Sequence, residues 1–156
     1  MLKINLITIG DIKEKYLRDA IEEYSKRIKR FANLNIIEIK ESIPASNSAK
    51  DIEIALTKDA KNIEKHLSGH VVCLDIKGKM ISSEEFAEKI KKISLNSSEI
   101  SFIIGASNGI SEEIKKLCNE RVSFSPMTFP HQLMRVIFLE QLYRSFTILN
   151  NIAYHK

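Results

Sequence analysis

Two segments of this chain combine residue types that small-molecule chemistry needs. The first, Ser101–Gly109 (SFIIGASNG), is an apolar run that ends in a glycine-bounded turn. The second, Phe124–Arg135 (FSPMTFPHQLMR), is a loop in which Pro130 opens an apolar helix. Glycine lets a backbone approach a ligand where a side chain would block it. The two segments predict a pocket, in which a Cβ at Gly105 would point into the ligand.

Histidines supply the candidate acid and base groups. His131 falls in the first turn of the predicted helix, where the positive end of the helix dipole favours a neutral imidazole that suits a general base. An imidazole that only hydrogen-bonds at a crowded helix start fits the same pattern. The chain then stops at Tyr154-His155-Lys156. These three can stack on a base and pair with phosphate, although most chain ends fray and have no function.

Several other chemistries lack their sequence patterns. No histidine pairs with a cysteine at zinc-finger spacing, so no metal site is predicted. There is no G-x-S-x-G nucleophile elbow. The Gly105–Gly109 turn is neither the dinucleotide fingerprint nor a P-loop. On pattern alone it fits an ordinary tight turn as well as a ligand loop.

Strand and helix patterns alternate along the chain. Apolar or β-branched runs predict five strands, at residues 2–9, 34–39, 70–76, 100–104 and 122–124. Helical spacing or capping residues predict helices between them, at 17–31 and 52–67 and after Ser82 and Ser111. Gly69 is predicted to cap the second helix in the left-handed conformation. The pattern predicts a single α/β domain over 1–156, with a mainly parallel five- to six-stranded sheet flanked by helices.

The carboxyl edge of such a sheet is where open α/β folds bind small molecules, and both candidate loops fall there. A final helix holds apolar residues from Leu133 to Leu149 on more than one face. Such a helix is either the centre of the core or half of a subunit interface.

Bulk composition narrows the class of protein. With 156 residues, 44% of them hydrophobic, the chain fits one domain. A charge of +4 is compatible with a polyanionic partner without requiring one. The basic residues between Lys13 and Arg30 fit either a solvated helix face or an RNA-facing stripe. Without a secretory or membrane-spanning run, we expect a cytoplasmic protein with two reduced cysteines and no membrane partner.

Several motifs in the same order resemble one family. They are Leu74-Asp-Ile-Lys-Gly78 with Ser82–Ala87, Phe102–Gly109, Met127–Arg135 with Glu140–Arg144, and the closing Tyr154-His155. Together they span the whole chain and resemble the large-subunit ribosomal RNA pseudouridine N3-methyltransferases, small members of the SPOUT class. Two positions depart from that family's usual pattern. Ala106 stands where a second glycine is usual, and Lys156 replaces a terminal arginine, which keeps the charge but loses the planar fork.

The resemblance implies a homodimer in which the last third of each chain forms a trefoil knot that binds S-adenosylmethionine. It implies cofactor-binding roles for Leu74, Gly105, Phe124, Ser125, Pro126, Met127, Thr128 and Phe129. It implies substrate-binding roles for Arg135, Tyr154, His155 and Lys156, the last three reaching in from the partner subunit. His131 and His155 both remain candidates for the catalytic base. The implied substrate is ribosomal RNA, in the ribosome because a barely basic protein has little charge to hold naked RNA.

Two other function classes remain open from the sequence. One is a catalytically silent RNA-binding or ribosome-assembly protein with the same fold. The other is a nucleotide-binding enzyme of the flavodoxin-like type. A ligand-dependent gain in thermal stability separates them from a methyltransferase, because each class binds a different small molecule.

Overall fold

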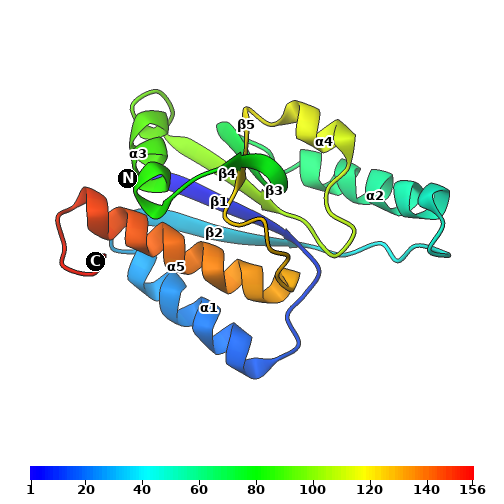
Figure 1. The fold of residues 1–156 in the computed structure, drawn as a ribbon, viewed down its shortest axis with the longest axis horizontal. Coiled ribbons are helices and arrows are strands. Elements are labelled where there is room, and N and C mark those ends of the chain that lie inside the picture. The colour runs from blue at the N-terminus through cyan, green and yellow to red at the C-terminus, as the bar shows by residue number, and fades with distance from the viewer.

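Five strands alternate with five helices over residues 1–156, all of which the computed structural model describes (Figure 1). The strands are β1 (Leu2–Ile9), β2 (Ala32–Ile39), β3 (His70–Met80), β4 (Glu99–Ile104) and β5 (Glu120–Ser123). The helices are α1 (Lys15–Ile28), α2 (Ala49–Glu64), α3 (Ser83–Ser94), α4 (Glu112–Leu117) and α5 (His131–Leu149). The predicted order of elements is confirmed, with boundaries shifted by a few residues.

The strands form one sheet in the order β2-β1-β4-β3-β5, and every neighbouring pair is parallel. The α/β class with a parallel five-stranded sheet is therefore confirmed. Helices α1, α3 and α5 cover one face, and α2 and α4 cover the other (Figure 1). Central strands β1 and β4 are apolar along most of their length because both of their faces are buried.

Each face of the sheet has its own apolar core. Beneath α3 and α5, the rings of Phe86, Phe102 and Phe138 pack against one another with centroids 4.9 to 6.1 Å apart. On the other face, Ile103 packs with Ile114 of α4. Although α5 is apolar around most of its surface, no helix has the length and apolarity that crossing a membrane requires.

Serine side chains cap three helices, α2, α3 and α4. Ser82 accepts a hydrogen bond from the Glu85 backbone at 3.1 Å, and the Glu85 side chain accepts one from the Ser82 backbone. This capping box is confirmed. Ser48 and Ser111 cap α2 and α4 through their side chains. Helix α5 begins at His131, directly after Pro130, as predicted.

Gly69 has a different role from the predicted one. Helix α2 already ends at Glu64, so Gly69 does not cap it and that part of the prediction is wrong. The predicted left-handed conformation of Gly69 is confirmed. Its φ is +67°, and a Cβ there would lie 2.1 Å from the backbone oxygen of Glu99. Only glycine allows the chain to pass β4 this closely as it enters β3.

A detour interrupts the pairing of β3 with β5. Leu74 and Lys79 both pair with Val122, so the intervening residues bulge out around this point of β5. At Gly78 a Cβ would lie 2.7 Å from the carbonyl carbon of Arg121, so the bulge runs directly against the β5 backbone. The detour turns residues 74–76 toward the carboxyl edge of the sheet, where they line a cavity.

Candidate active site

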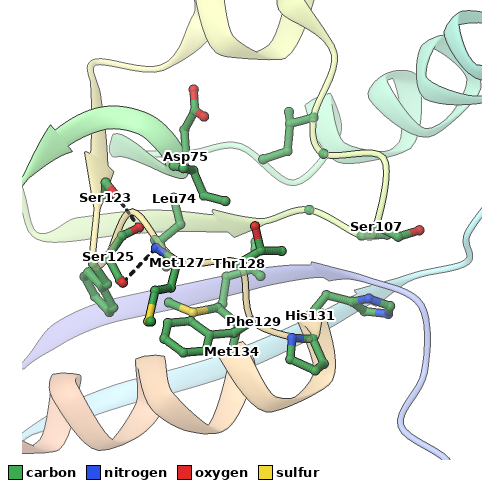
Figure 2. Close-up of a pocket in the computed structure, with 18 of the residues that line it drawn as sticks. Leu74, Asp75, Ser107, Ser123, Ser125, Met127, Thr128, Phe129, His131 and Met134 are labelled. Atoms are coloured by element: carbon green, nitrogen blue, oxygen red, sulfur yellow. Dashed lines mark hydrogen bonds between the residues drawn. The ribbon is translucent and has the colours of Figure 1, made fainter. Parts of the chain in front are cut away.

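A cavity of about 580 Å³ opens at the carboxyl ends of β3, β4 and β5. Its walls come from Leu74 and Asp75 of β3, the turn after β4, the loop after β5 and the first turns of α5 (Figure 2). Ten of its 20 lining residues are hydrophobic. A mainly apolar cavity of this size with a few polar groups suits a small organic ligand with a flat ring.

The cavity brings together most of the predicted cofactor residues. Seven of the eight line it, namely Leu74, Gly105, Phe124, Ser125, Met127, Thr128 and Phe129. Pro126 is not among the lining residues. The predicted pocket is therefore formed by the predicted loops.

The loop after β5 is held in shape by its own side chains. Ser123 donates a hydrogen bond to the backbone oxygen of Ser125 at 3.0 Å. The Ser125 hydroxyl accepts one from the Met127 backbone, also at 3.0 Å (Figure 2). Phe124 fixes the start of the loop by packing edge-on against Phe86, with ring centroids 5.1 Å apart. A wall fixed in advance loses little conformational freedom when a ligand binds.

The glycine turn works differently from the prediction. A Cβ on Gly105 would lie 2.7 Å from both the Gly109 backbone oxygen and the Ile110 side chain, so it would meet the returning turn. The prediction that it would point into the ligand is wrong. The turn closes through a hydrogen bond from the Gly109 backbone to the Ala106 oxygen at 2.9 Å. Ala106, the departure from the usual glycine, packs against the core on the α4 side of the sheet.

Two charged residues of the cavity wall were missed from the sequence. Asp75 and Lys115 both line the cavity, and Asp75 Oδ2 lies 3.6 Å from the ammonium of Lys115. This oxygen is buried and has no hydrogen-bond partner. The other carboxylate oxygen accepts a bond from the Lys77 backbone at 3.1 Å. The only sequence signal was an aspartate at the end of an apolar strand, so the packing of α4 against β3 was needed to find the pair.

A family model described as a predicted SPOUT methyltransferase matches residues 2–155. The chain belongs to the SPOUT methyltransferase family.

Full-length relatives agree with this membership. The chain is 48% identical to a protein of Clostridium botulinum, over 99% of this chain and all of that protein. It is 46% identical to a protein of Alkaliphilus oremlandii over the same shares, and 46% identical to one of Caldicellulosiruptor saccharolyticus over 98% and 99%. All three are named ribosomal RNA large subunit methyltransferase H.

Solved structures with little sequence similarity share the fold. A Bordetella pertussis protein titled a probable methyltransferase superposes with a TM-score of 0.56 at 10% identity, covering 92% of this chain and 96% of that one. A Haemophilus influenzae protein titled a probable methylase superposes with a TM-score of 0.52 at 16% identity, covering 99% and 70%. At these identities the likeness concerns the fold alone, and it agrees with the SPOUT assignment.

Within this SPOUT methyltransferase the two candidate histidines lie far apart. His131 lines the cavity from the first residue of α5. His155 folds back on the other end of the same helix, where its Nδ1 lies 3.2 Å from Arg144 and its Nε2 lies 2.7 Å from Glu84. Arg144 lies 13 residues along α5 from His131, which is about 20 Å at 1.5 Å per residue. One chain therefore does not place both histidines in one site.

Arg135 is buried, with 2% of its surface exposed. Its guanidinium donates hydrogen bonds to Glu38 at 2.8 Å and to the Gly10 backbone oxygen at 3.0 Å. Burial lowers the pKa of Arg135, and the Glu38 carboxylate partly offsets that effect. These contacts tie α5 to the ends of β1 and β2, so this geometry does not support the predicted contact between Arg135 and the substrate.

Proposed function

We propose that this protein transfers the methyl group of S-adenosylmethionine to N3 of a pseudouridine in large-subunit ribosomal RNA, within the ribosome. The observation that carries the proposal is the full-length identity of 46 to 48% to proteins named ribosomal RNA large subunit methyltransferase H. SPOUT membership supports S-adenosylmethionine as the cofactor. The methylated atom rests on the motif resemblance and is part of the proposal.

The residues of the cavity fit this cofactor. Leu74, Ile104 and Phe129 offer an apolar slot for an adenine ring. The loop from Phe124 to Phe129 offers backbone donors and acceptors at the rim. Asp75 Oδ2 makes no hydrogen bond and lies 3.6 Å from both Lys115 and Arg121. The carboxylate of Asp75 and the ammonium of Lys115 line the cavity, where they could contact the ammonium and carboxylate of an amino-acid group. When bound there, S-adenosylmethionine supplies an activated methyl group.

The chain's own residues then have two tasks. They hold the two reacting atoms in line, which is the main requirement of methyl transfer. They also accept the weakly acidic N3 proton, a step worth roughly 10²- to 10⁴-fold in rate. We assign the proton to His131 because it lines the cavity. His155 lies outside the cavity of its own chain and has both ring nitrogens engaged, so we do not assign it the proton. The substrate contact of His155, with Tyr154 and Lys156, rests on the family resemblance.

We further infer a homodimer with a site shared between subunits. Leu133 of α5 is 39% exposed, and neighbouring Val136 and Ile137 are only partly buried, which leaves an apolar strip for a partner. A twofold axis that pairs the two α5 helices antiparallel would bring one chain's tail to the other chain's cavity. The trefoil knot rests on the motif resemblance and is part of the same proposal.

The experiment combines binding with product analysis. A selective gain in thermal stability with S-adenosylmethionine or its demethylated product supports the cofactor, whereas a gain only with flavin or nucleotide would favour the flavodoxin-like alternative. Large subunits from cells that lack the protein should accept one methyl group, which mass spectrometry should place on N3 of a pseudouridine. Cofactor binding without methyl transfer to subunits or whole ribosomes would indicate a silent RNA-binding protein. Ribosomes are the substrate, so we place the enzyme in the cytoplasm.

A further inference from the structure

The motif Glu140–Arg144 lies outside the cavity and forms a polar cluster around the chain end. Glu140 Oε1 accepts hydrogen bonds from the Tyr154 hydroxyl at 3.0 Å and from Arg144 Nη2 at 2.5 Å. The Arg144 guanidinium also lies over the Tyr154 ring, 4.8 Å from its centroid. Tyr143 packs edge-on against the same ring at 4.9 Å. Tyr154 is thus held by a hydrogen bond to its hydroxyl and by two contacts with its ring.

The same cluster sets the tautomer of His155. Arginine only donates hydrogen bonds, so the Nδ1 that lies 3.2 Å from Arg144 must be the acceptor. In the neutral ring the hydrogen is then on Nε2, which donates to Glu84 of α3 at 2.7 Å. With both nitrogens fixed, the ring cannot rotate freely. Two elements of one chain therefore hold this imidazole in one orientation.

The arrangement is unusual for the last residues of a chain, which ordinarily fray. The tail from Asn150 is neither helix nor strand. Backbone hydrogen bonds hold it as far as Ile152, which donates to the Thr147 oxygen at 2.9 Å, and side chains anchor Tyr154 and His155. Burial and the adjacent Glu140 carboxylate, which accepts the hydrogen bond of the protonated hydroxyl, raise the pKa of Tyr154 to about 12. A tail fixed in this way is ready to meet a substrate without first being ordered.

We propose that Glu140 and Arg144 are positioning residues, which hold Tyr154 and His155 in the conformation that enters the partner's cavity. This inference rests on the proposed function, and it gives the Glu140–Arg144 motif a role that is separate from cofactor binding. Because the motif lies on the same chain as the tail it holds, the two must act in the same subunit. A defect in the motif should therefore behave as a defect in the tail.

The first test compares variants by kinetics on large subunits that lack the methyl group. Glu140→Ala should lower kcat roughly 10²-fold, since small misplacements have effects of that size. Glu140→Gln keeps an acceptor for Tyr154 and should recover part of the rate. Arg144→Lys should remain slow because lysine lacks the planar fork. Affinity for the demethylated cofactor, measured by calorimetry, should stay within about twofold, since no variant touches the cavity.

Asp19→Ala is the matched control. It removes another ion pair between residues four apart, that of Asp19 with Lys15, which has no contact with the tail cluster. It should leave kcat unchanged. Equal losses in the control and in Glu140→Ala, or a large loss of cofactor affinity in Glu140→Ala, would overturn the positioning role.

The second test asks in which subunit the motif acts. Heterodimers are purified through two different amino-terminal tags. Glu140→Ala paired with a cavity-blocked chain, Gly105→Val or Thr128→Trp, should recover activity, because one intact tail then faces one intact cavity. Glu140→Ala paired with a tail-deleted chain should not recover. The opposite pattern would show that Glu140 serves the cavity of its own chain and would overturn the proposal.

A third readout does not depend on activity. Nitrogen NMR of the His155 ring should show a neutral Nε2–H tautomer in the native protein and an averaged ring in Glu140→Ala. If native protein transfers no methyl group but shows this change, the proposed function fails while the positioning holds. A ring already averaged in the native protein would overturn the positioning itself.

Discussion

The two ends of α5 differ in nearly every physical respect. At the amino end, His131 and Met134 face an apolar cavity whose wall is built by backbone turns and aromatic packing. From the middle of the helix toward its carboxyl end, Glu140 and Arg144 contact the tail through charged hydrogen bonds. The first end suits a small, largely apolar ligand. The second end suits contact with a polar substrate through Tyr154 and His155.

The separation of these ends is the basis for proposing a site that two subunits share. About 20 Å of helix separate His131 from Arg144, which contacts His155. The tail is also anchored away from its own cavity, to α3 and α5. If both groups act in one site, as proposed, a second chain must supply one of them, and each prediction below alters one end while reading out the other.

Removing the tail should have the largest effect. Deleting Tyr154 to Lys156 removes the groups proposed to contact the RNA, and methyl transfer should fall by at least about 10²-fold. Cofactor affinity should stay within a few-fold, because none of these residues lines the cavity. Methyl incorporation into large subunits and calorimetry with the demethylated cofactor give the two values. Full turnover by the truncated enzyme would show that the tail is only a frayed end.

Replacing His131 tests the cavity at the amino end of α5. His131→Gln keeps a polar side chain of similar length but cannot accept the N3 proton, so kcat should fall roughly 10²- to 10⁴-fold. The loss should shrink as pH rises, because the substrate then ionises without help. Single-turnover rates across a pH series measure this. A uniform loss at every pH would assign His131 to positioning, and no loss would return the base to His155.

A smaller effect is expected from the loop after β5. Ser125→Ala removes the acceptor of the Met127 backbone hydrogen bond, a loss of about 1 kcal/mol. If that energy holds the binding conformation, cofactor affinity should weaken about fivefold, with kcat at saturation unchanged. Ser94→Ala is the control, because Ser94 makes a similar bond to the Lys91 backbone at the end of α3. Equal cofactor affinities in the two variants would show that the hydrogen bond to Ser125 does not hold the loop in its binding conformation.

The smallest effect is a shift in one carboxyl pKa. The hydrogen bond from His155 lowers the pKa of Glu84. The ionised carboxylate therefore favours tail docking above the ordinary glutamate pKa, and docking weakens as pH falls through the lowered value. Deleting the tail should raise the pKa of Glu84 toward its ordinary value, whereas Gly105→Val should leave it low. Carbon NMR titration of Glu84 measures both, and an unchanged pKa after deletion would mean that the tail does not dock there.

The sequence predicted the parts of the fold that depend on local patterns. Apolar runs located the strands, and Ser82 with Glu85 located a helix start, because hydrophobic period and capping are properties of short segments. The cavity loops were also found, since parallel strands bring their carboxyl ends to one edge. The family resemblance added the identities of the cavity residues, and these came from matched motifs.

Contacts between distant segments could not be predicted. Gly69 and Gly105 were recognised as special, but the backbone each one meets lies across the fold or around a turn. Arg135 was taken as a substrate contact because nothing local revealed its burial against Glu38. The pairing of Asp75 with Lys115, and of Tyr154 with Glu140, depends on how helices pack on the sheet. Such pairs are fixed by tertiary structure, which sequence spacing does not encode directly.

The central claim is that one site is built from two chains, and purified heterodimers test it most directly. A tail-deleted chain is paired with a cavity-blocked chain, either Gly105→Val, whose Cβ displaces the turn, or Thr128→Trp, which fills the cavity from its exposed rim. Each parent homodimer should be inactive, folded and dimeric. The heterodimer should regain about half of the native activity per dimer, since one of its two sites is intact. If every tail served its own cavity, no heterodimer would contain a working site, and absence of recovery in a verified heterodimer would contradict the account.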